Sequence, residues 1–375
     1  MTSGDPVPDH IVLAILGTGL MGGSLGLACR KRGLVERVIG YDIQPDRLAR
    51  AIERGAITEA AESPRSAVRE ATLTVIASPV GSIPGVFAEI AGQLPQDAIV
   101  TDVGSTKSRV VEDIQALAPA DVHFIGGHPI AGSEHEGIDA ADADLYTGAF
   151  WILTPTRETD TAAYGRLVRF LARLDAHVLS LDPGRHDELV ALTSHLPQLL
   201  SSTLMGFAAD IAASEGGLPL VTAGGFRDMT RIAGSSPDLW VDIVRENRRA
   251  ILELLNRFQG ALATAGSYVE AEDWEGLRRV LVGAREGRKN LPDKPGLAPA
   301  CIVELKVVVL DHPGSLAAVT TTVGEAGVNI EDFYVVHSLE GGKGTIHLTL
   351  NGEPAARNAK EALEKKGFTA ELAAN

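Results

Sequence analysis

The sequence predicts an α/β Rossmann-like domain, followed by an all-α domain and a small ferredoxin-like α+β domain. Three observations predict this order. Short β-rich runs alternate with helical stretches up to about residue 181, strands are then absent up to about residue 287, and β-rich runs return after a proline-rich stretch. Alternating strands and helices typically form an open sheet that is covered on both faces by helices.

Residues 1–182 form the first predicted domain, in which the strands are short runs of β-branched and apolar residues. These runs are residues 11–16, 38–41, 73–77, 99–103, 150–154 and 177–181. The segments between them, for example residues 44–55 and 162–174, carry apolar residues at helical spacing. The alternation predicts a parallel sheet, with the apolar pair Phe124-Ile125 at the end of one more buried strand.

Residues 183–290 form the second predicted domain, which contains only helices. The helical segments are residues 186–214, 222–232, 237–265 and 270–285. Ser236 before Pro237 provides a cap residue and a proline at the first helical position, and both are typical of a helix start. A helical block of this size that is rich in leucine, isoleucine and alanine often builds a dimer interface.

Residues 291–300 form a linker, because prolines punctuate this stretch. Residues 301–375 form the third predicted domain. Its strands are expected at residues 301–310, 330–337 and 345–350, and its helices at residues 315–326 and 355–366. This order gives most of a ferredoxin-like βαββαβ unit.

The composition excludes several classes of protein. The 375 residues carry a net charge of −15, which disfavours nucleic acid or an anionic membrane as a partner. The two cysteines, Cys29 and Cys301, match no metal-ligand or disulfide spacing, as expected in the reducing cytoplasm. Residues 1–9 lack the features of a signal peptide, and polar residues break the apolar stretch 189–211, so no membrane span is expected.

A glycine-rich loop between the first strand and the first helix predicts a dinucleotide site. It reads Gly17-Thr18-Gly19-Leu20-Met21-Gly22. The first glycine permits the tight turn, the second lets a pyrophosphate reach the backbone, and the third allows close packing of helix on strand. The helix N-terminus then faces the phosphates. Cofactor contacts are therefore expected from Gly17, Gly19, Leu20, Met21 and Gly22, and from Ser78 and Pro79 after the third run.

Asp42 closes the second run, about 20 residues after the last glycine, where such folds hold the ribose of the cofactor. A carboxylate there accepts hydrogen bonds from the ribose 2′-hydroxyl and repels a 2′-phosphate. The neighbours Ile43 and Gln44 offer no cation, although Arg47 is near. We therefore expect NAD rather than NADP.

His128 lies in the segment Gly126-Gly127-His128-Pro129-Ile130-Ala131-Gly132, directly after the expected strand end. Glycine lets the main chain approach a ligand, and proline fixes the backbone. Open α/β sheets place their chemistry at the carboxyl ends of the strands, where a histidine suits proton transfer. The alternative is a structural histidine in a turn. Ser105, in the segment Asp102–Lys107 after another strand, is expected at the same end of the sheet, and its alternative role is a helix cap.

Candidates for binding a substrate are polar residues in otherwise apolar or helical segments. Buried polar groups in a helix need partners, and arginines four residues apart share a helix face and suit a carboxylate. Polar residues that follow the histidine segment are placed to line or gate a pocket. The alternatives are a salt-bridged surface helix and solvated side chains. The candidates are Ser194, His195 and Gln198, the pair Arg227 and Arg231, and the pair Ser133 and Glu134.

Together these segments resemble the prephenate and arogenate dehydrogenases of tyrosine biosynthesis, over roughly residues 10–290. The resemblance rests on the glycine loop and on the motifs at residues 102–107, 126–132, 194–197 and 226–233. It implies a cytoplasmic homodimer that uses NAD, and no metal, to convert prephenate to 4-hydroxyphenylpyruvate by oxidative decarboxylation.

The resemblance also implies a role for each matching residue. His128 is the catalytic histidine that hydrogen-bonds the 4-hydroxyl of the substrate ring, and Ser105 orients both groups. Arg231 binds a substrate carboxylate. The remaining residues line or surround the pocket, namely Ser194, His195 and Arg227 within it, Ser133, Glu134 and Asp187 at its mouth, and Trp240 near it, across the dimer.

Gln198 departs from the family pattern. Many prephenate-preferring members carry a histidine at this position, beside the substrate side chain. Glutamine donates or accepts a hydrogen bond but cannot become cationic. Arogenate, or a dual cyclohexadienyl specificity, is therefore the alternative to prephenate.

The tail resembles an ACT regulatory domain through residues 311–316 and 327–330. The resemblance suggests feedback by an amino acid, most simply tyrosine. The expected effector residues are Asp311, Gly314, Asn329 and Ile330. The alternative is a docking or oligomerisation module without a ligand.

Two other classes of function are weighed against this interpretation. A non-catalytic sensor of NAD and an amino acid would not need His128, Ser105 and Arg231 together. Dehydrogenases that act on hydroxyacids or reduce imines usually carry a lysine on the first long helix of the helical domain. Residues 188–211 contain no lysine, which counts against that class.

Overall fold

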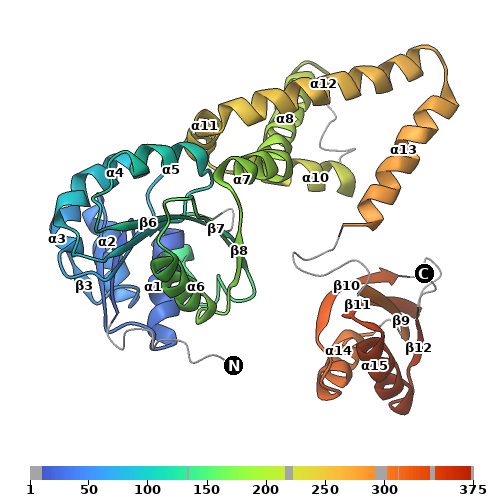
Figure 1. The fold of residues 1–375 in the computed structure, drawn as a ribbon. Coiled ribbons are helices and arrows are strands. Elements are labelled where there is room, and N and C mark those ends of the chain that lie inside the picture. The colour runs from blue at the N-terminus through green and yellow to red at the C-terminus, as the bar shows by residue number, and fades with distance from the viewer. Residues whose placement is uncertain are drawn as a thin grey trace. The chain divides into compact units, whose positions relative to one another are not determined.

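The computed structural model describes residues 11–132, 135–215, 223–291, 302–310, 312–337 and 343–372. The chain divides into two compact units, residues 1–262 and 263–375, and each is described by itself (Figure 1). No helix within the described ranges combines the length and apolar character needed to cross a membrane.

The first unit contains an eight-stranded sheet with the order β3-β2-β1-β4-β5-β6-β7-β8. The short β3 (Glu59–Ala60) was not predicted, and β6 (His123–Ile130) contains the predicted Phe124-Ile125 but continues beyond the strand end expected there. The other strands coincide with the predicted runs, and they are β1 (Val12–Leu16), β2 (Arg37–Tyr41), β4 (Leu73–Ile76), β5 (Ile99–Asp102), β7 (Phe150–Thr154) and β8 (His177–Ser180).

Helices cover both faces of this sheet. One buried cluster joins Ile15 and Val75 of the sheet to Leu25 and Phe170 of the helices on the first face. A second cluster joins Leu16 and Val100 to Phe87 on the other face. The first face carries α1 (Leu20–Lys31), α2 (Pro45–Glu53) and α6 (Thr161–Ala172), and the second carries α3 (Pro64–Val68), α4 (Ile83–Ile90) and α5 (Ser108–Gln115). The short 3-10 helices η1 (Val80–Ser82), η2 (Ala91–Gln93) and η3 (Ile138–Ala140) complete the connections.

The sheet is not entirely parallel, so that part of the sequence prediction was wrong. Residues 123–125 of β6 pair with β5 in parallel, and residues 126–130 pair with β7 in the antiparallel direction. A parallel return needs a long crossover that is usually helical, whereas the described part of the β6–β7 connection holds only η3. His128 pairs with Ile152 in this ladder, so it lies inside a strand and not after the end of one.

The helical segment of the first unit begins with α7 (Pro183–Val190), whose first turn is capped by the side chain of Asp182. The predicted helix 186–214 is divided by a π-helical turn, η4 (Ala191–His195), before α8 (Leu196–Glu215). The predicted helix 237–265 is also divided, because Asn247, with φ −110° and ψ 28°, separates α11 (Pro237–Glu246) from α12 (Arg248–Glu270). Between these lie α10 (Gly224–Thr230) and η5 (Arg231–Gly234).

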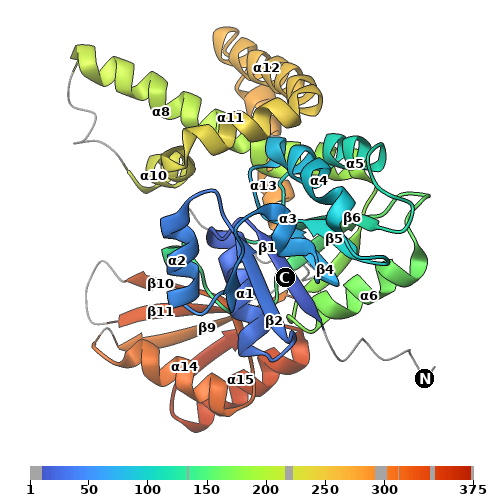
Figure 2. The ribbon, with the colours of Figure 1, turned by 90° about the vertical axis from the view of Figure 1, so that its left-hand side faces the viewer.

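This helical segment lies against the loops that follow β4 and β5. Helix α11 contacts η1, and α7 contacts α5. Figures 1 and 2 show α8, α10 and α11 together at one end of the unit, with the sheet and its covering helices at the other.

The second unit contains α13 (Trp274–Lys289) and a four-stranded antiparallel sheet with the order β10-β11-β9-β12. Helices α14 (Ser315–Glu325) and α15 (Glu353–Lys365) pack on one face of this sheet, around Leu305, Val307 and Leu348. The βαββαβ prediction is confirmed, and β12 is its unpredicted last strand. The predicted linker lies outside the described residues from residue 292 onward. The elements are β9 (Ile302–Leu310), α14 (Ser315–Glu325), β10 (Ile330–His337), β11 (Lys343–Asn351), α15 (Glu353–Lys365) and β12 (Thr369–Leu372).

Candidate active site

The glycine loop has the geometry of a phosphate cradle. Gly17 has a φ of 107°, and a Cβ atom there would lie 2.4 Å from the Ala77 carbonyl oxygen. A Cβ atom on Gly22 would lie 2.0 Å from the Gly17 oxygen, which explains the close packing of α1 on β1. A Cβ atom on Gly19 would meet nothing within 4 Å, so open space borders the backbone at the start of α1. These residues therefore fit a bound dinucleotide.

Asp42 is buried at the end of β2 and is held in place by the glycine loop. Its Oδ2 accepts hydrogen bonds from the Thr18 amide at 2.8 Å and from the Thr18 hydroxyl at 3.2 Å. Its Oδ1 accepts one from the Gln44 amide at 3.0 Å. The Arg47 guanidinium lies 3.6 Å from Oδ2 and forms an ion pair with Asp42. The carboxylate is thus fixed where a ribose would bind.

The other predicted cofactor residues surround this loop. Leu20 and Met21 open α1, and the Met21 carbonyl accepts a hydrogen bond from the Tyr146 hydroxyl at 2.7 Å. Ser78 and Pro79 follow β4, and a Cβ atom on Gly17 would lie 3.1 Å from the Ser78 amide nitrogen. The ends of β1, β2 and β4 therefore bring these residues together.

His128 begins a buried chain of hydrogen bonds. Its Nδ1 lies 2.8 Å from Nε2 of His186, and Nδ1 of His186 lies 2.8 Å from Oδ1 of Asp187. The pKa of His128 is well below its ordinary value, first because burial removes water from the ring and then because His186, Lys107 and His195 lie nearby. The ring is therefore neutral at neutral pH and able to accept a proton.

Asp187 is buried, with 5% of its surface exposed, and does not stand at the mouth of a pocket as the resemblance implied. Its carboxylate accepts hydrogen bonds from the amides of Lys107, at 2.7 Å, and Ser108, at 2.8 Å. It thereby caps α5 from another segment of the chain. Burial by itself raises the pKa of Asp187, but the hydrogen bonds from His186, Ser108 and Lys107 outweigh it and lower the pKa.

A fully buried ion pair between Lys107 and Asp102 supports the same region. Asp102 also accepts hydrogen bonds from the amides of Gly104, at 2.8 Å, and Gly127, at 3.0 Å. The pair therefore ties β6 beside His128 to the loop after β5. Ser105 lies half-buried in that loop, and the described residues include no hydrogen bond between its hydroxyl and His128.

His195 lies in the π-helical turn and is almost fully buried. Its Nδ1 is 3.2 Å from Nδ2 of Asn247, and the same Nδ2 is 2.8 Å from the main-chain oxygen of Asp187. The indole of Trp240 meets the imidazole edge-on, with 5.9 Å between the ring centroids. Burial lowers the pKa of His195 to about 4, so this ring is also neutral. π-helical turns are frequent at functional sites.

Gln198 connects α8 to the turn that carries Arg231. Its Nε2 donates to the Ile232 carbonyl oxygen at 2.9 Å and to the Ser202 hydroxyl at 3.2 Å. Its Oε1 is buried and has no hydrogen-bond partner among the described residues. The side chain therefore presents an acceptor and uses its donor to position η5.

The two predicted arginines lie on consecutive helical elements and not on a single α-helix. Helix α10 ends at Thr230, Arg227 lies on it, and Arg231 opens η5. Both side chains are exposed, and so is Ser194. Ser133 and Glu134 lie outside the described residues.

The sequence did not single out His186 or Asn247. Neither belongs to a local pattern, because their partners are distant in the chain. The sequence signal nearest to His186 was the helix start at Asp182-Pro183, which places His186 and Asp187 in the first turns of α7.

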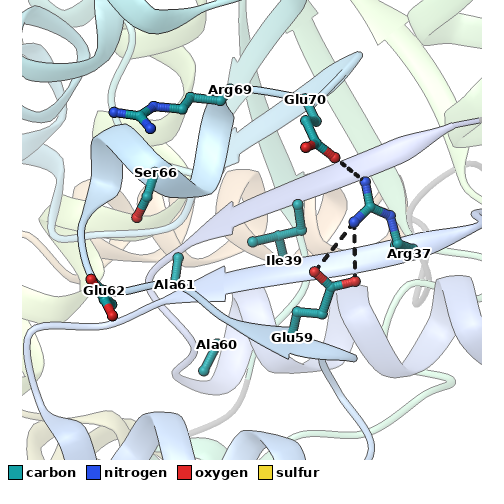
Figure 3. Close-up of a pocket in the computed structure, with 9 residues that line it drawn as sticks. All are labelled: Arg37, Ile39, Glu59, Ala60, Ala61, Glu62, Ser66, Arg69 and Glu70. Carbon is teal, nitrogen blue, oxygen red and sulfur yellow. Dashed lines mark hydrogen bonds and ion pairs between the residues drawn. The ribbon is translucent and has the colours of Figure 1, made fainter.

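A hollow at the outer edge of the sheet contains none of these residues. Arg37 bridges Glu59, at 3.2 Å, and Glu70, and Ser66 and Arg69 complete the rim (Figure 3). In Figure 3 the Arg69 side chain points away from this ion-pair cluster. Exposed pairs of this kind contribute little to binding or stability, so the hollow is an edge feature of β2 and β3.

Comparisons with known proteins match the whole architecture. Family models match residues 25–180 as a prephenate dehydrogenase nucleotide-binding domain, residues 182–282 as a prephenate dehydrogenase dimerization domain, and residues 303–368 as an ACT domain. A prephenate dehydrogenase of Bacillus subtilis strain 168 is 34% identical over 362 residues, with 96% of each chain covered. A prephenate dehydrogenase of Lactococcus lactis is 28% identical, with 94% of this chain and 97% of that protein covered.

Solved structures agree with these matches. The crystal structure of A. aeolicus prephenate dehydrogenase in complex with hydroxyphenyl propionate and NAD+ has a TM-score of 0.71 and 30% identity. It covers 78% of this chain and 100% of its own. The Synechocystis arogenate dehydrogenase has a TM-score of 0.65 and 30% identity, and covers 75% of this chain and 99% of its own.

Proposed function

This chain belongs to the prephenate dehydrogenase family, and from that premise we propose how its residues oxidise and decarboxylate prephenate to 4-hydroxyphenylpyruvate. It is an NAD-dependent oxidoreductase with an ACT domain. Two relatives that cover nearly the whole chain are named prephenate dehydrogenases, so arogenate is not the favoured substrate.

His128 is the general base of the proposed reaction. Bound NAD+ supplies the acceptor for the hydride that leaves C4 of the substrate ring. His128 accepts the proton of the 4-hydroxyl as that carbon becomes a carbonyl, and loss of CO2 from the ring then gives the phenol. General-base catalysis of this kind contributes about 10²–10⁴-fold. The observation that supports this role is the neutral His128 ring, which hydrogen-bonds to His186, and His186 in turn hydrogen-bonds to Asp187.

The remaining predicted residues are proposed to bind and orient the substrate. Arg231 and Arg227 offer guanidinium groups to its carboxylates, which they would bind with paired hydrogen bonds. Gln198 supports this role indirectly, because it fixes the turn that begins at Arg231. Ser105 orients the hydroxyl, and Ser194, His195, Trp240, Ser133 and Glu134 line the pocket or its entrance.

His128→Asn tests the proposal. The variant is expected to fold and to bind NAD+ as the parent does, while kcat falls by about 10²-fold or more. NADH formation with prephenate and with arogenate should be followed side by side, with prephenate the better substrate. A kcat close to that of the parent protein would sink the assignment of the base.

We also propose that the active form is a cytoplasmic homodimer that tyrosine inhibits through the ACT domain. The matched dimerization domain and large exposed apolar side chains on its helices support assembly, since patches of this kind mark interfaces. The clearest of these side chains are Leu192, Phe207, Leu239 and Val241. Sedimentation analysis would detect the dimer.

The effector site is proposed at the start of α14 and of β10. Gly314, with a φ of 96°, caps α14, and Asn329 and Ile330 lead into β10. Asp311 lies outside the described residues. A tyrosine titration that changes neither rate, thermal stability nor assembly would remove the feedback proposal.

A further inference from the structure

We propose that one buried residue, Asp187, sets two histidines of the site, His128 and His195, in opposite tautomers. One chain of hydrogen bonds runs from its carboxylate through His186 to His128. The other runs from its main-chain oxygen through Asn247 to His195. The first leaves Nε2 of His128 without a hydrogen, and the second leaves a hydrogen on Nε2 of His195. The inference rests on the function proposed above, in which both rings face the substrate.

The orientation of Asn247 determines the tautomer of His195. The atom 2.8 Å from the Asp187 carbonyl oxygen must be the amide nitrogen, because a carbonyl oxygen can only accept. The same nitrogen lies 3.2 Å from Nδ1 of His195 and can only donate. Nδ1 of His195 is therefore the acceptor, and the neutral ring carries its hydrogen on Nε2.

The carboxylate of Asp187 determines the tautomer of the other ring. Two main-chain amides of the α5 start already stabilise it as an anion, so it accepts from Nδ1 of His186. A neutral His186 then has a lone pair on Nε2. The hydrogen in its 2.8 Å contact with His128 must come from Nδ1 of His128. Nε2 of His128 is left free to accept.

The scheme applies to a neutral His186. The ring is fully buried and in contact with His128, and a second hydrogen on it would occupy Nε2. It would also reverse the contact, so that Nε2 of His128 carried the hydrogen. A ring in that state could not take the substrate proton.

The two tautomers suit two kinds of substrate group, a hydroxyl that gives up its proton and an oxygen that accepts a hydrogen bond. The bare Nε2 of His128 accepts the hydroxyl proton, and the charge that forms there is stabilised through His186 by the Asp187 anion. The Nε2–H of His195 donates to an oxygen of the substrate, either a carboxylate or the ketone. His186 and Asn247 are positioning residues, since each acts through another ring.

Nitrogen-15 spectra of the full chain, labelled at histidine, test this directly, because protonated and bare ring nitrogens have well-separated shifts. Signals are assigned with His128→Asn and His195→Asn. We expect the hydrogen on Nδ1 of His128 and on Nε2 of His195 at neutral pH, without substrate. The same tautomer in both rings would overturn the proposal.

Asn247→Ala is expected to leave His128 unchanged and to mix the tautomers of His195. Loss of this hydrogen bond should raise the KM for prephenate about tenfold with little change in kcat. His186→Ala should instead lower kcat and leave KM nearly unchanged. NAD+ affinity and thermal unfolding serve as fold controls, and an unchanged His195 spectrum in Asn247→Ala contradicts the inference.

Failure of this inference differs from failure of the proposed function. Wrong tautomers together with normal prephenate turnover would overturn the Asp187 scheme alone. Correct tautomers in a protein that does not turn over prephenate would overturn the function alone. If Asn247→Ala fails to fold, the spectrum of the unaltered protein still decides the question.

Discussion

Replacing Lys107 with methionine tests how strongly the buried ion pair supports the site. Both side chains of the Lys107–Asp102 pair are completely inaccessible to solvent, and removing one partner of such a pair costs about 3–5 kcal/mol. Asp102 keeps its two amide donors in the variant, so we expect the lower end of this range, about 3 kcal/mol. For a domain of this size that corresponds to about 6–12 °C in Tm.

Lys107→Met should also change the pKa of His128, the proposed general base. The positive charge of Lys107 helps to lower the pKa of His128, so its removal should raise that pKa and shift the acid limb of the kcat/KM profile to higher pH. Thermal unfolding and the pH profile are the two measurements. Arg109→Met is the matched control, because the Arg109 side chain is 59% exposed and its pair with Glu246 should contribute less than about 1 kcal/mol. A Tm within about 2 °C of the parent would refute the reasoning.

Three further predictions follow from the site. Because the pKa of His128 is depressed, kcat/KM should stay level near neutral pH and fall only as acid protonates the ring; a fall that starts at pH 7 would contradict this. Gly19→Ala should weaken NAD+ binding with little effect on Tm, whereas Gly22→Ala should destabilise the fold, as a titration and a melting curve for each variant would show. Gln198→Leu loses the bond to the Ile232 carbonyl and should raise the KM for prephenate about tenfold, with Ser202→Ala as the milder control.

The sequence predicted the central strands well because they are short apolar runs buried on both faces of the sheet, such as β4 and β5. The glycine loop and Asp42 were also predictable, since backbone geometry restricts the residues allowed there. The reversal at β6 was not, because the run around His128 contains nothing that distinguishes a parallel from an antiparallel neighbour. The direction follows from the β6–β7 connection, whose described part lacks a crossover helix.

The hydrogen-bond partners of the site histidines could not be found from local patterns, because these partners are distant in the sequence. His186 is 58 residues away in sequence, and Asn247 meets His195 across 52 residues. A histidine or an asparagine in a helical segment has no spacing that identifies its partner. Family resemblance singled out His128 as the candidate base and placed Asp187 at a pocket mouth, whereas Asp187 is buried, because exposure depends on how the helical segment packs against the sheet.

The docking of the helical segment on the sheet explains why the site needs both parts. The contacts between the two parts include Asp187 on the start of α5, Asp242 on the Gly81 amide at 3.0 Å, and Glu246 on Arg109 at 3.3 Å. His128 comes from the sheet, whereas the rings that set and complement it come from the helices. Only the Asp187 contact is both buried and part of the hydrogen-bonded chain. In the proposed scheme Asp187 therefore both joins the two segments and sets the state of the base, so a shift in docking is expected to alter catalysis before it unfolds the protein.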